Sequence, residues 1–460
     1  MEAQESFHHA LKFKYDLCIG CSHCTECCPT AAIHIENGRP VLDDNRCIDC
    51  GHCYLACPVH AIYIEQDDFQ TIYNYKVPVL LCPSIFGAQF PDKVKEKDIV
   101  AAVADLGFRH IYEVEQSVDV IKQLLTKKMQ DPDREMPVIS SFCPAIVRLI
   151  QVKFPSLVGN LMLTKPPLDL TALYIKKHLV ETQGVAPEDI GIFYVAPCAA
   201  KIAAVKSPVG DEKSPIDGVI NMNYLYNKVL RRIKQGDCPP PPADLRMNIL
   251  SKDALLWALT DGEISLLKKG RNLAIDDVHN VSTFLEKLEN EDIDDIDFLE
   301  LRACDQSCAG GILCANNRFL IVEKQKYRAE KSPAEVTVKE NGLLADADYL
   351  DKHSKVGKVE PRSMDKLDND ISVAMRKMEK SISINKHLPQ IDCRMCGYQS
   401  CKEFSLAVGS EKTDIKRCVF IQRILERNAR LSTEEALQIA YKIWGTDKFN
   451  PDNIADLAIE

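Results

Sequence analysis

The sequence lacks three features that would place its function elsewhere. The chain of 460 residues contains no apolar run approaching ~20 residues, so we expect no membrane insertion. Residues 1–15 contain no long apolar core, so we expect no signal peptide. There is no excess of basic residues either. The formal net charge is −10, which argues against nucleic acid as a partner, because such binding needs a basic surface.

What the sequence has in abundance is cysteine. The chain holds 20 cysteines, with 46% hydrophobic and 27% charged residues, and is long enough for several domains. Disulfide-rich scaffolds are short and secreted, which this chain is not. Most of its cysteines stand in tight groups with the spacing of metal ligands. We therefore expect a cytoplasmic protein whose thiols bind metal.

Two copies of the pattern C-x2-C-x2-C-x3-C-P open the chain. Their cysteines are Cys18, Cys21, Cys24 and Cys28, then Cys47, Cys50, Cys53 and Cys57. Each copy is followed by a short strand-like stretch, at residues 32–35 and 61–64. The duplication resembles a bacterial two-cluster ferredoxin, in which three cysteines of one copy and the last of the other hold each 4Fe-4S cube. Zinc is the weaker alternative, because zinc sites rarely use eight thiols in this spacing. We predict an α+β ferredoxin domain over residues 1–70.

The sequence between residues 71 and 354 alternates strand and helix patterns. Strands are predicted at 77–81, at the start of 137–144 and at 191–196, and helices at 98–106, 117–129 and 145–154. This alternation predicts an α/β domain with site residues at the strand ends. Thr283 and Glu286 have the spacing of a capping box at the start of a further helix.

A third cysteine group follows a charged linker predicted over residues 355–385, which has a helical stretch near its end. The group consists of Cys393, Cys396, Cys401 and Cys418, in the pattern C-x2-C-G-x3-C plus one later cysteine. It predicts a small, mainly α-helical 4Fe-4S module at 386–425; a zinc knuckle is the alternative. Residues 426–460 are predicted as a helical tail with a capped helix at 432–445.

Four of the remaining cysteines have a context that suits one further cube. Two follow predicted strands next to proline and two form a C-x3-C pair before a double glycine: Cys143, Cys198, Cys304 and Cys308. The glycines, Gly310 and Gly311, would let backbone approach the inorganic surface. The other three, Cys82, Cys238 and Cys314, are interpreted as buried or solvent-facing thiols.

Residues 77–331 resemble the catalytic domain of the FeFe (iron-only) hydrogenases. Three family motifs are recognisable: T-S-C-C-P at 140–144, M-P-C-x-x-K-x-x-E at 196–204 and E-x-M-x-C-x-x-x-C-x-G-G at 300–311. With its flanking domains the chain is similar to divergent members of sensory type. The resemblance implies two lobes around a cube held by the four central cysteines, with Cys308 bridging to a di-iron subcluster that carries CO, cyanide and a dithiolate. It also places Ser84 and Lys201 at this cofactor, with Lys201 donating to cyanide.

The departures from these motifs concern proton delivery. The family's proton-delivering cysteine falls on Phe142, which has no exchangeable proton. The flanking methionines fall on Ala196 and Arg302, and the motif glutamate falls on Ala204. No acidic relay is evident at 118–124. Arg302 has four options: to enter the di-iron space, to bind an anion, to pair with a carboxylate, or to point elsewhere.

Three functions remain open. The first is a hydrogenase-like oxidoreductase with slow H2 turnover that senses hydrogen or redox state. The second is an electron-transfer protein or non-hydrogen redox enzyme that holds a cube, or another cofactor, without the di-iron unit. The third is an iron–sulfur assembly scaffold, against which the C-terminal module argues. The first two imply a redox partner protein, a ferredoxin or a reductase, and the first also implies a signalling partner.

Overall fold

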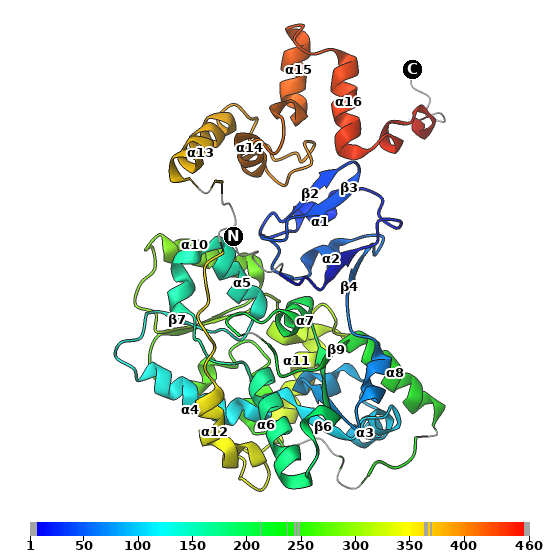
Figure 1. Ribbon diagram of the computed structural model, residues 1–460, viewed down its shortest axis with the longest axis vertical. Coiled ribbons are helices and arrows are strands. Elements are labelled where there is room, and N and C mark those ends of the chain that lie inside the picture. The colour runs from blue at the N-terminus through cyan, green and yellow to red at the C-terminus, as the bar shows by residue number, and fades with distance from the viewer. Residues whose placement is uncertain are drawn as a thin grey trace. The chain divides into compact units, whose positions relative to one another are not determined.

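The computed structural model describes residues 7–211, 213–236, 238–242, 245, 249–362, 367–368 and 370–454. The ends of the predicted ferredoxin domain and helical tail, 1–6 and 455–460, lie outside these residues. The chain forms two compact units (Figure 1). The first comprises Met1–Ala10, Ile48–Gly51 and Ile64–Pro361, and the second comprises Leu11–Cys47, His52–Tyr63 and Arg362–Glu460. No helix among the described residues is long and apolar enough to cross a membrane.

The first unit contains a four-stranded parallel sheet in the order β6-β5-β8-β9. Its strands are β5 (Val77–Cys82), β6 (His110–Glu113), β8 (Ile190–Ala196) and β9 (Gly218–Asn221). All residues of β8 are buried, and β5 is buried after its first residue. Parallel strands are typically covered on both faces, which explains why these segments read as continuous apolar runs.

A second parallel sheet of the same unit has three strands, in the order β10-β11-β7. They are β7 (Val138–Ile139), β10 (Asn272–Ile275) and β11 (Phe298–Leu301). In the register, Phe298 pairs with Val138 and Leu299 with Ile139. The two sheets fit the predicted α/β architecture.

The helices predicted in this unit are confirmed with small shifts of their ends. They are α3 (Glu96–Asp105), α4 (Val118–Met129) and α5 (Pro144–Lys153). Further helices are α6 (Pro167–Gln183), α7 (Ala199–Lys206), α8 (Met222–Gln235), α9 (Lys252–Leu256), α10 (Val278–Glu289), α11 (Arg318–Glu330) and α12 (Ala347–His353), with the short 3-10 helices η2 (Ser84–Gln89) and η3 (Val114–Ser117).

The capping box predicted at Thr283 is wrong. Helix α10 begins at Val278, and its cap is Asp277, which accepts a hydrogen bond from the backbone N–H of His279. The Thr283 hydroxyl instead donates to the carbonyl of His279 one turn earlier. A threonine inside a helix can make this bond, so the spacing to Glu286 alone did not identify a helix start.

The second unit joins the ferredoxin repeat to the C-terminal module. The repeat forms the strands β1 (Leu11–Phe13), β2 (Ile33–Glu36), β3 (Arg39–Leu42) and β4 (Ile62–Ile64), with short helices α1 (His23–Glu26) and α2 (His52–Ala56). The module is helical, with α14 (Cys401–Gly409), α15 (Val419–Arg427) and α16 (Thr433–Trp444). Arg417 donates to the carbonyl of Ile35, and the N–H of Ile35 donates to the carbonyl of Gly397. These bonds tie the two predicted domains together.

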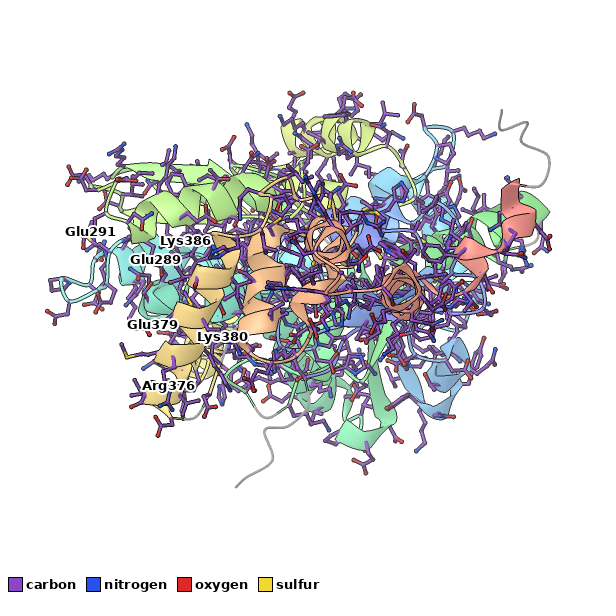
Figure 2. All side chains as sticks on the ribbon, turned by 90° about the horizontal axis from the view of Figure 1, so that it is seen from above. Glu289, Glu291, Arg376, Glu379, Lys380 and Lys386 are labelled. Carbon is purple, nitrogen blue, oxygen red and sulfur yellow. The ribbon has the colours of Figure 1, made fainter. Side chains whose placement is uncertain are left out.

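Two predictions near the C-terminus are confirmed. The predicted linker contains a helical stretch, α13 (Ile371–Asn385), and Figure 2 shows Arg376, Glu379 and Lys380 along it. Helix α16 is capped as predicted, and the cap is a capping box: Ser432 accepts from the N–H of Glu435, and Glu435 accepts from the N–H of Ser432.

Candidate metal centre and redox site

The carboxyl ends of the two sheets bring the four central cysteines together. Cys198 follows β8, Cys143 follows β7, and Cys304 and Cys308 follow β11. Burial raises the pKa of the Cys304 thiol well above its usual value, and the neighbouring thiols of Cys198, Cys143 and Cys308 raise it further. The thiols that raise this pKa follow strands of both sheets. The fold therefore brings four thiols together, which is the number of ligands that a 4Fe-4S cube requires.

Two of these cysteines stand at the N-terminal caps of helices. Cys143 caps α5 and Cys198 caps α7. The positive end of a helix dipole favours negative charge, such as that of thiolate ligands. Burial raises the pKa of the Cys198 thiol to about 12, so ionisation needs nearby positive charge. Lys201 and the irons of a cube would supply that charge.

The double glycine allows a backbone contact. A Cβ on Gly310 would lie 1.9 Å from the carbonyl oxygen of Asp305, and one on Gly311 would lie 2.6 Å from that of Pro197. The N–H of Leu313 donates to the same Pro197 carbonyl at 2.9 Å. That these glycines also let the backbone approach an inorganic surface stays a prediction, and the structure shows what else they do. They let the Cys308 turn pack against the turn that carries Cys198.

Lys201 lies beside the cysteine predicted to bridge. Its Nζ is 3.5 Å from Cys308 Sγ, and the residue is only 7% exposed. A buried ammonium held next to a thiolate is suited to stabilise anionic groups at this position. The structure thus places Lys201 in the site.

Phe142 occupies the same space from the other side. Its ring centroid lies 4.3 Å from Lys201 Nζ and 4.2 Å from Arg302 Cζ. The ring also makes an edge contact with Trp257, at 5.7 Å between centroids. Cations over an aromatic face are attracted by its quadrupole, most strongly where water is excluded. The Phe142 ring is therefore held between two cations, and it has no proton to transfer.

Arg302 pairs with carboxylates, which is one of the four possibilities that the sequence left open. Its Nη2 lies 2.6 Å from Glu263 Oε1 and 3.4 Å from Glu300 Oε1, and the residue is 1% exposed. Ser140 Oγ donates to Glu263 at 2.6 Å. Burial raises the pKa of Glu300 to about 7, although Arg302 opposes this. The sequence motif contained Glu300 and Ser140 but gave no sign of Glu263.

Several buried donors around the four cysteines have no hydrogen-bond partner within the described part of the chain. They are Arg302 Nε and Nη1, Ser307 Oγ and the Tyr194 hydroxyl. An unpaired buried polar group costs about 1–3 kcal/mol. Thiolates, inorganic sulfide and cyanide are acceptors, so these donors fit a cube with an anionic group near Cys308.

Two cavities beside Phe142 have volumes of about 100 and 20 Å³. The smaller has room for about one water.

Ser84 connects the site to a buried carboxyl that the sequence did not reveal. Its backbone N–H donates to Glu115 Oε2 at 2.7 Å, and its Oγ accepts from Gln325 Nε2 at 2.7 Å. Burial raises the pKa of Glu115 to about 7, whereas Ser84 and Lys201 lower it. The sequence did not indicate Glu115 because its contact with Ser84 joins residues that are far apart in the chain.

The other predicted positions lie around this centre. Ala196 ends β8, and Ala204 lines the larger cavity beside Phe142. In segment 118–124, Asp119 accepts from Ser251 and Lys122 pairs with Asp253, both away from the cysteines.

The other three cysteines of the central region lie outside the four-cysteine group and have contacts of their own. Cys82 donates to the carbonyl of Tyr112, and Cys314 donates to the carbonyl of Cys308. Cys238 is half-buried in the proline segment.

The ferredoxin repeat shows the same local contact twice. Cys28 Sγ accepts from the N–H of Ala32, and Cys57 Sγ accepts from the N–H of Ala61, both at 3.2 Å. Such bonds stabilise thiolate ligands and tune cluster potentials. Cys27 instead donates to the carbonyl of Cys24.

The C-terminal cysteines also converge. Burial raises the pKa of the Cys396 thiol to about 12, and the thiols of Cys418, Cys393 and Cys401 raise it as well. Among the described residues, no three cysteine sulfurs come within 4.8 Å of one another. Tetrahedral zinc with bonds of ~2.3 Å would need sulfurs about 3.8 Å apart. Within the described part of the chain, the thiols of this module do not meet that requirement.

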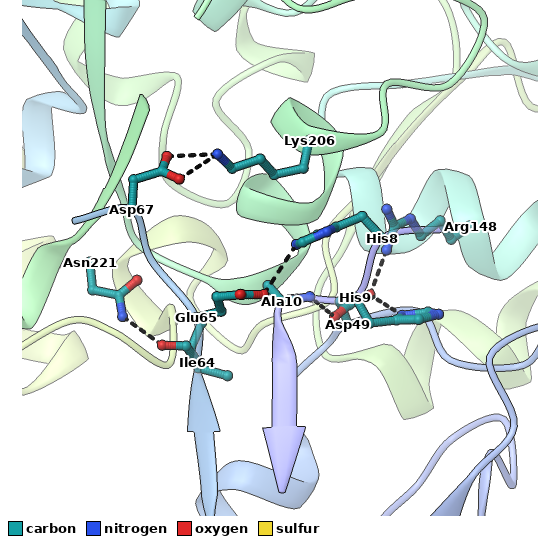
Figure 3. A network of polar contacts seen from close by, with 10 residues as sticks. All are labelled: His8, His9, Ala10, Asp49, Ile64, Glu65, Asp67, Arg148, Lys206 and Asn221. Carbon is teal, nitrogen blue, oxygen red and sulfur yellow. Dashed lines mark hydrogen bonds and ion pairs between the residues drawn. The ribbon is translucent and has the colours of Figure 1, made fainter. Parts of the chain in front are cut away.

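The loop at 48–51, from the second ferredoxin copy, belongs to the unit that holds the central site. A Cβ on Gly51 would meet the Ile312 side chain at 2.3 Å, and Cys50 raises the pKa of Cys304. Buried Asp49 accepts from Arg148 at 2.6 Å and contacts His9 (Figure 3). Arg148 lies on α5, the helix that Cys143 caps. A ferredoxin ligand loop is thereby fixed near the central cysteines.

The relatives of this chain cover it only in part. Iron hydrogenase 1 of Clostridium pasteurianum is 24% identical over 228 residues, which are 48% of this chain and 37% of that protein. The periplasmic [Fe] hydrogenase large subunit of Nitratidesulfovibrio vulgaris is 29% identical over 216 residues, 42% of this chain and 50% of that protein. The chain thus spans half or less of their length. A solved structure of HydA1 from Chlamydomonas reinhardtii is 15% identical, with TM-score 0.48, over 63% of this chain and 95% of that one.

Comparison with known protein families identifies three segments. Residues 10–67 match a 4Fe-4S dicluster domain, and residues 388–420 match an Fe-S cluster family. Residues 76–270 match the family described as the C-terminal domain of the iron-only hydrogenase large subunit. The central part of this chain is therefore similar to the iron-only hydrogenases, and matches to two further iron–sulfur domains flank it.

Proposed function

We propose that this chain is a hydrogenase-like redox protein that senses hydrogen or redox state and turns over H2 slowly. The observation that carries the proposal is the Phe142 ring fixed between Lys201 and Arg302 beside Cys308. The ligand set for a cube is complete here, and the position from which the family delivers protons holds a phenyl ring. Loss of a positioned acid lowers rates by roughly 10²–10⁴-fold. A sensor tolerates such a loss better than a hydrogen producer does.

In this proposal Cys143, Cys198, Cys304 and Cys308 hold the central cube, and Cys308 would bridge to a di-iron unit. That unit, when bound, would supply the iron at which hydrogen is activated. Lys201 would orient its anionic ligands through a charge-assisted hydrogen bond. Phe142 and Trp257 would exclude water from the same side, which strengthens the electrostatic contacts inside.

Electrons would reach the central cube from the ferredoxin cubes. The position of Cys50 near Cys304, and the contact of Gly51 with Ile312, support this route. The cube of the C-terminal module offers a second point of exchange with a redox partner protein, a ferredoxin or a reductase. A signalling partner and a cytoplasmic location, where thiols stay reduced, belong to the same proposal.

Infrared spectroscopy of the full chain, produced with the maturation proteins that build the di-iron unit, tests this function. Bands of iron-bound CO and cyanide, together with weak H2 oxidation, are expected. A spectrum without these bands, from a preparation in which all four cubes are present, would refute the proposal.

A second candidate is an electron-transfer protein that holds a cube without the di-iron unit. The small cavities beside Phe142, about 100 and 20 Å³, favour it because they leave little free space next to the ring. Iron content separates the two candidates. Four cubes require about sixteen irons per chain, and a di-iron unit raises the number to about eighteen.

A further inference from the structure

Glu115 is a buried carboxyl that lies outside the positions the hydrogenase motifs assign to proton transfer. It stands in η3, directly after β6, and is 1% exposed. Burying a carboxyl is costly unless it is neutral or paired, so a carboxyl in such a place calls for an explanation.

Its hydrogen-bond partner leads outward to a cavity. The backbone N–H of Ser84 donates to Glu115, and Gln325 donates to the Ser84 hydroxyl. Because that hydroxyl accepts from Gln325, its own proton is left for another acceptor. Ser84, Gln325 and Arg328 line a cavity of about 210 Å³ whose rim includes the exposed residues Asp92 and Glu96. Ser84 thus lies between this cavity and Glu115: the residue lines the cavity, and its backbone N–H binds the carboxyl.

On the inner side, Glu115 faces the central site. Lys201 is close enough to lower the pKa of Glu115, and Glu115 in turn raises the pKa of Lys201. Lys201 Nζ is 3.5 Å from Cys308 Sγ. Glu115 is therefore joined to the cavity through Ser84 and interacts electrostatically with the ammonium that contacts a cube ligand.

The other charged and titratable groups around Glu115 are Glu113, Arg328, Tyr194 and Cys82. Glu113 is engaged by both terminal nitrogens of Arg328, at 2.6 and 2.8 Å. Burial raises the pKa values of Tyr194 and Cys82, so both stay neutral near pH 7. Lys201 and Arg328 are permanent cations here. Glu115 is thus the group in this cluster whose charge can change near neutral pH.

We propose that Glu115 takes up one proton from the 210 Å³ cavity, through Ser84, when the central cube accepts one electron. The oxidised cube gains the electron from a ferredoxin cube, which is oxidised in turn. The Glu115 carboxylate becomes the neutral acid, and the proton comes from cavity water. Charge balances, because one negative charge is added to the cube and one is removed from Glu115.

The physical reason is electrostatic. An electron placed on a buried cube raises the proton affinity of nearby acids, since charges interact strongly in a low-dielectric interior. Burial already raises the pKa of Glu115 to about 7 with the cube absent, so a small further increase suffices for uptake near neutral pH. The proposal rests on the central cube of the proposed function and not on the di-iron unit.

Redox titration of the full chain with its cubes reconstituted tests the proposal. The central cube signal is identified by electron paramagnetic resonance as the one lost in Cys304→Ser. Between about pH 7 and 8.5 the equilibrium constant for reducing this cube is expected to fall about tenfold per pH unit, or ~59 mV for one electron. In Glu115→Gln this dependence disappears. A flat wild-type titration, or a slope that persists in Glu115→Gln, overturns the proposal.

Two further variants sharpen the test. Glu96→Gln, at the exposed rim of the same cavity, is the control and should keep the wild-type slope. Ser84→Ala keeps the backbone N–H that binds Glu115 and removes the hydroxyl. It should keep the equilibrium slope and slow proton-coupled reduction at least severalfold; an unchanged rate would contradict the route through Ser84. If Glu115→Gln does not fold, the rate measured for Ser84→Ala still tests the proposal. Missing CO and cyanide bands would refute the sensor function and leave this titration interpretable.

Discussion

The guanidinium of Arg302 lies over the ring of Phe142, with 4.2 Å between Cζ and the ring centroid. Both residues differ from those of the hydrogenase motifs, and in the fold they contact each other. Arg302 is fixed by Glu263 and Glu300, so the ring is held in place by an anchored cation and not by a mobile one. Two substitutions that look independent in the sequence therefore form one structural feature.

Replacing the ring should restore part of a proton path. Phe142→Cys introduces a thiol beside Lys201 and Cys308, and in the matured protein it should raise H2 turnover by up to ~10²-fold, part of what a positioned acid contributes. Gas-phase H2 measurement against Phe142→Ala, which opens the same space without a proton donor, separates chemistry from access. Equal activity of the two variants would mean that proton donation at this position is not limiting.

Removing the cation should destabilise the site. Arg302→Met leaves Glu263 and Glu300 buried without their cation, and breaking a buried ion pair costs about 3–5 kcal/mol. We expect a lower midpoint for thermal loss of cluster absorbance, measured at one fixed scan rate. Adding Glu300→Gln to this variant should recover part of the loss, because one uncompensated carboxylate is removed. No difference between Arg302→Met and wild type would show that the pair contributes nothing.

The double glycine gives a prediction about assembly of the cube. Gly310→Ala would place a methyl group 1.9 Å from a backbone oxygen, so the turn that carries Cys308 cannot keep its shape. Loss of the central cube, about four irons per chain, is expected. Gly159→Ala is the matched control, because nothing lies within 4 Å of its added Cβ. Iron quantitation on both variants tests this, and a Gly310→Ala protein with full iron would contradict it.

The motifs and periodicity predicted much of this molecule, because their signals are local. Cysteine spacing predicted the ferredoxin and C-terminal groups, and apolar runs predicted β5 and β8. The residues that were missed reach the site through long-range contacts: Glu115 through Ser84, and Glu263 through Arg302. Thr283 shows the same limit in a helix, since Asp277, not the Thr283–Glu286 spacing, sets its start. Nor could spacing alone show that the loop at 48–51 joins the central unit while the rest of its repeat joins the C-terminal module.

Stability should fall as the pH rises through the neutral range. Burial raises the pKa values of Glu115 and Glu300 from 4.5 to about 7, so the folded chain binds more protons than the unfolded chain between these values. Their stabilising contribution is therefore fully present below about pH 4.5 and is lost as the pH rises to about 7. Thermal midpoints of the cube-loaded protein between about pH 5 and 8 should decline, and Glu115→Gln should flatten part of the decline. The same slope in wild type and Glu115→Gln would show that this carboxyl titrates alike in the folded and unfolded chains.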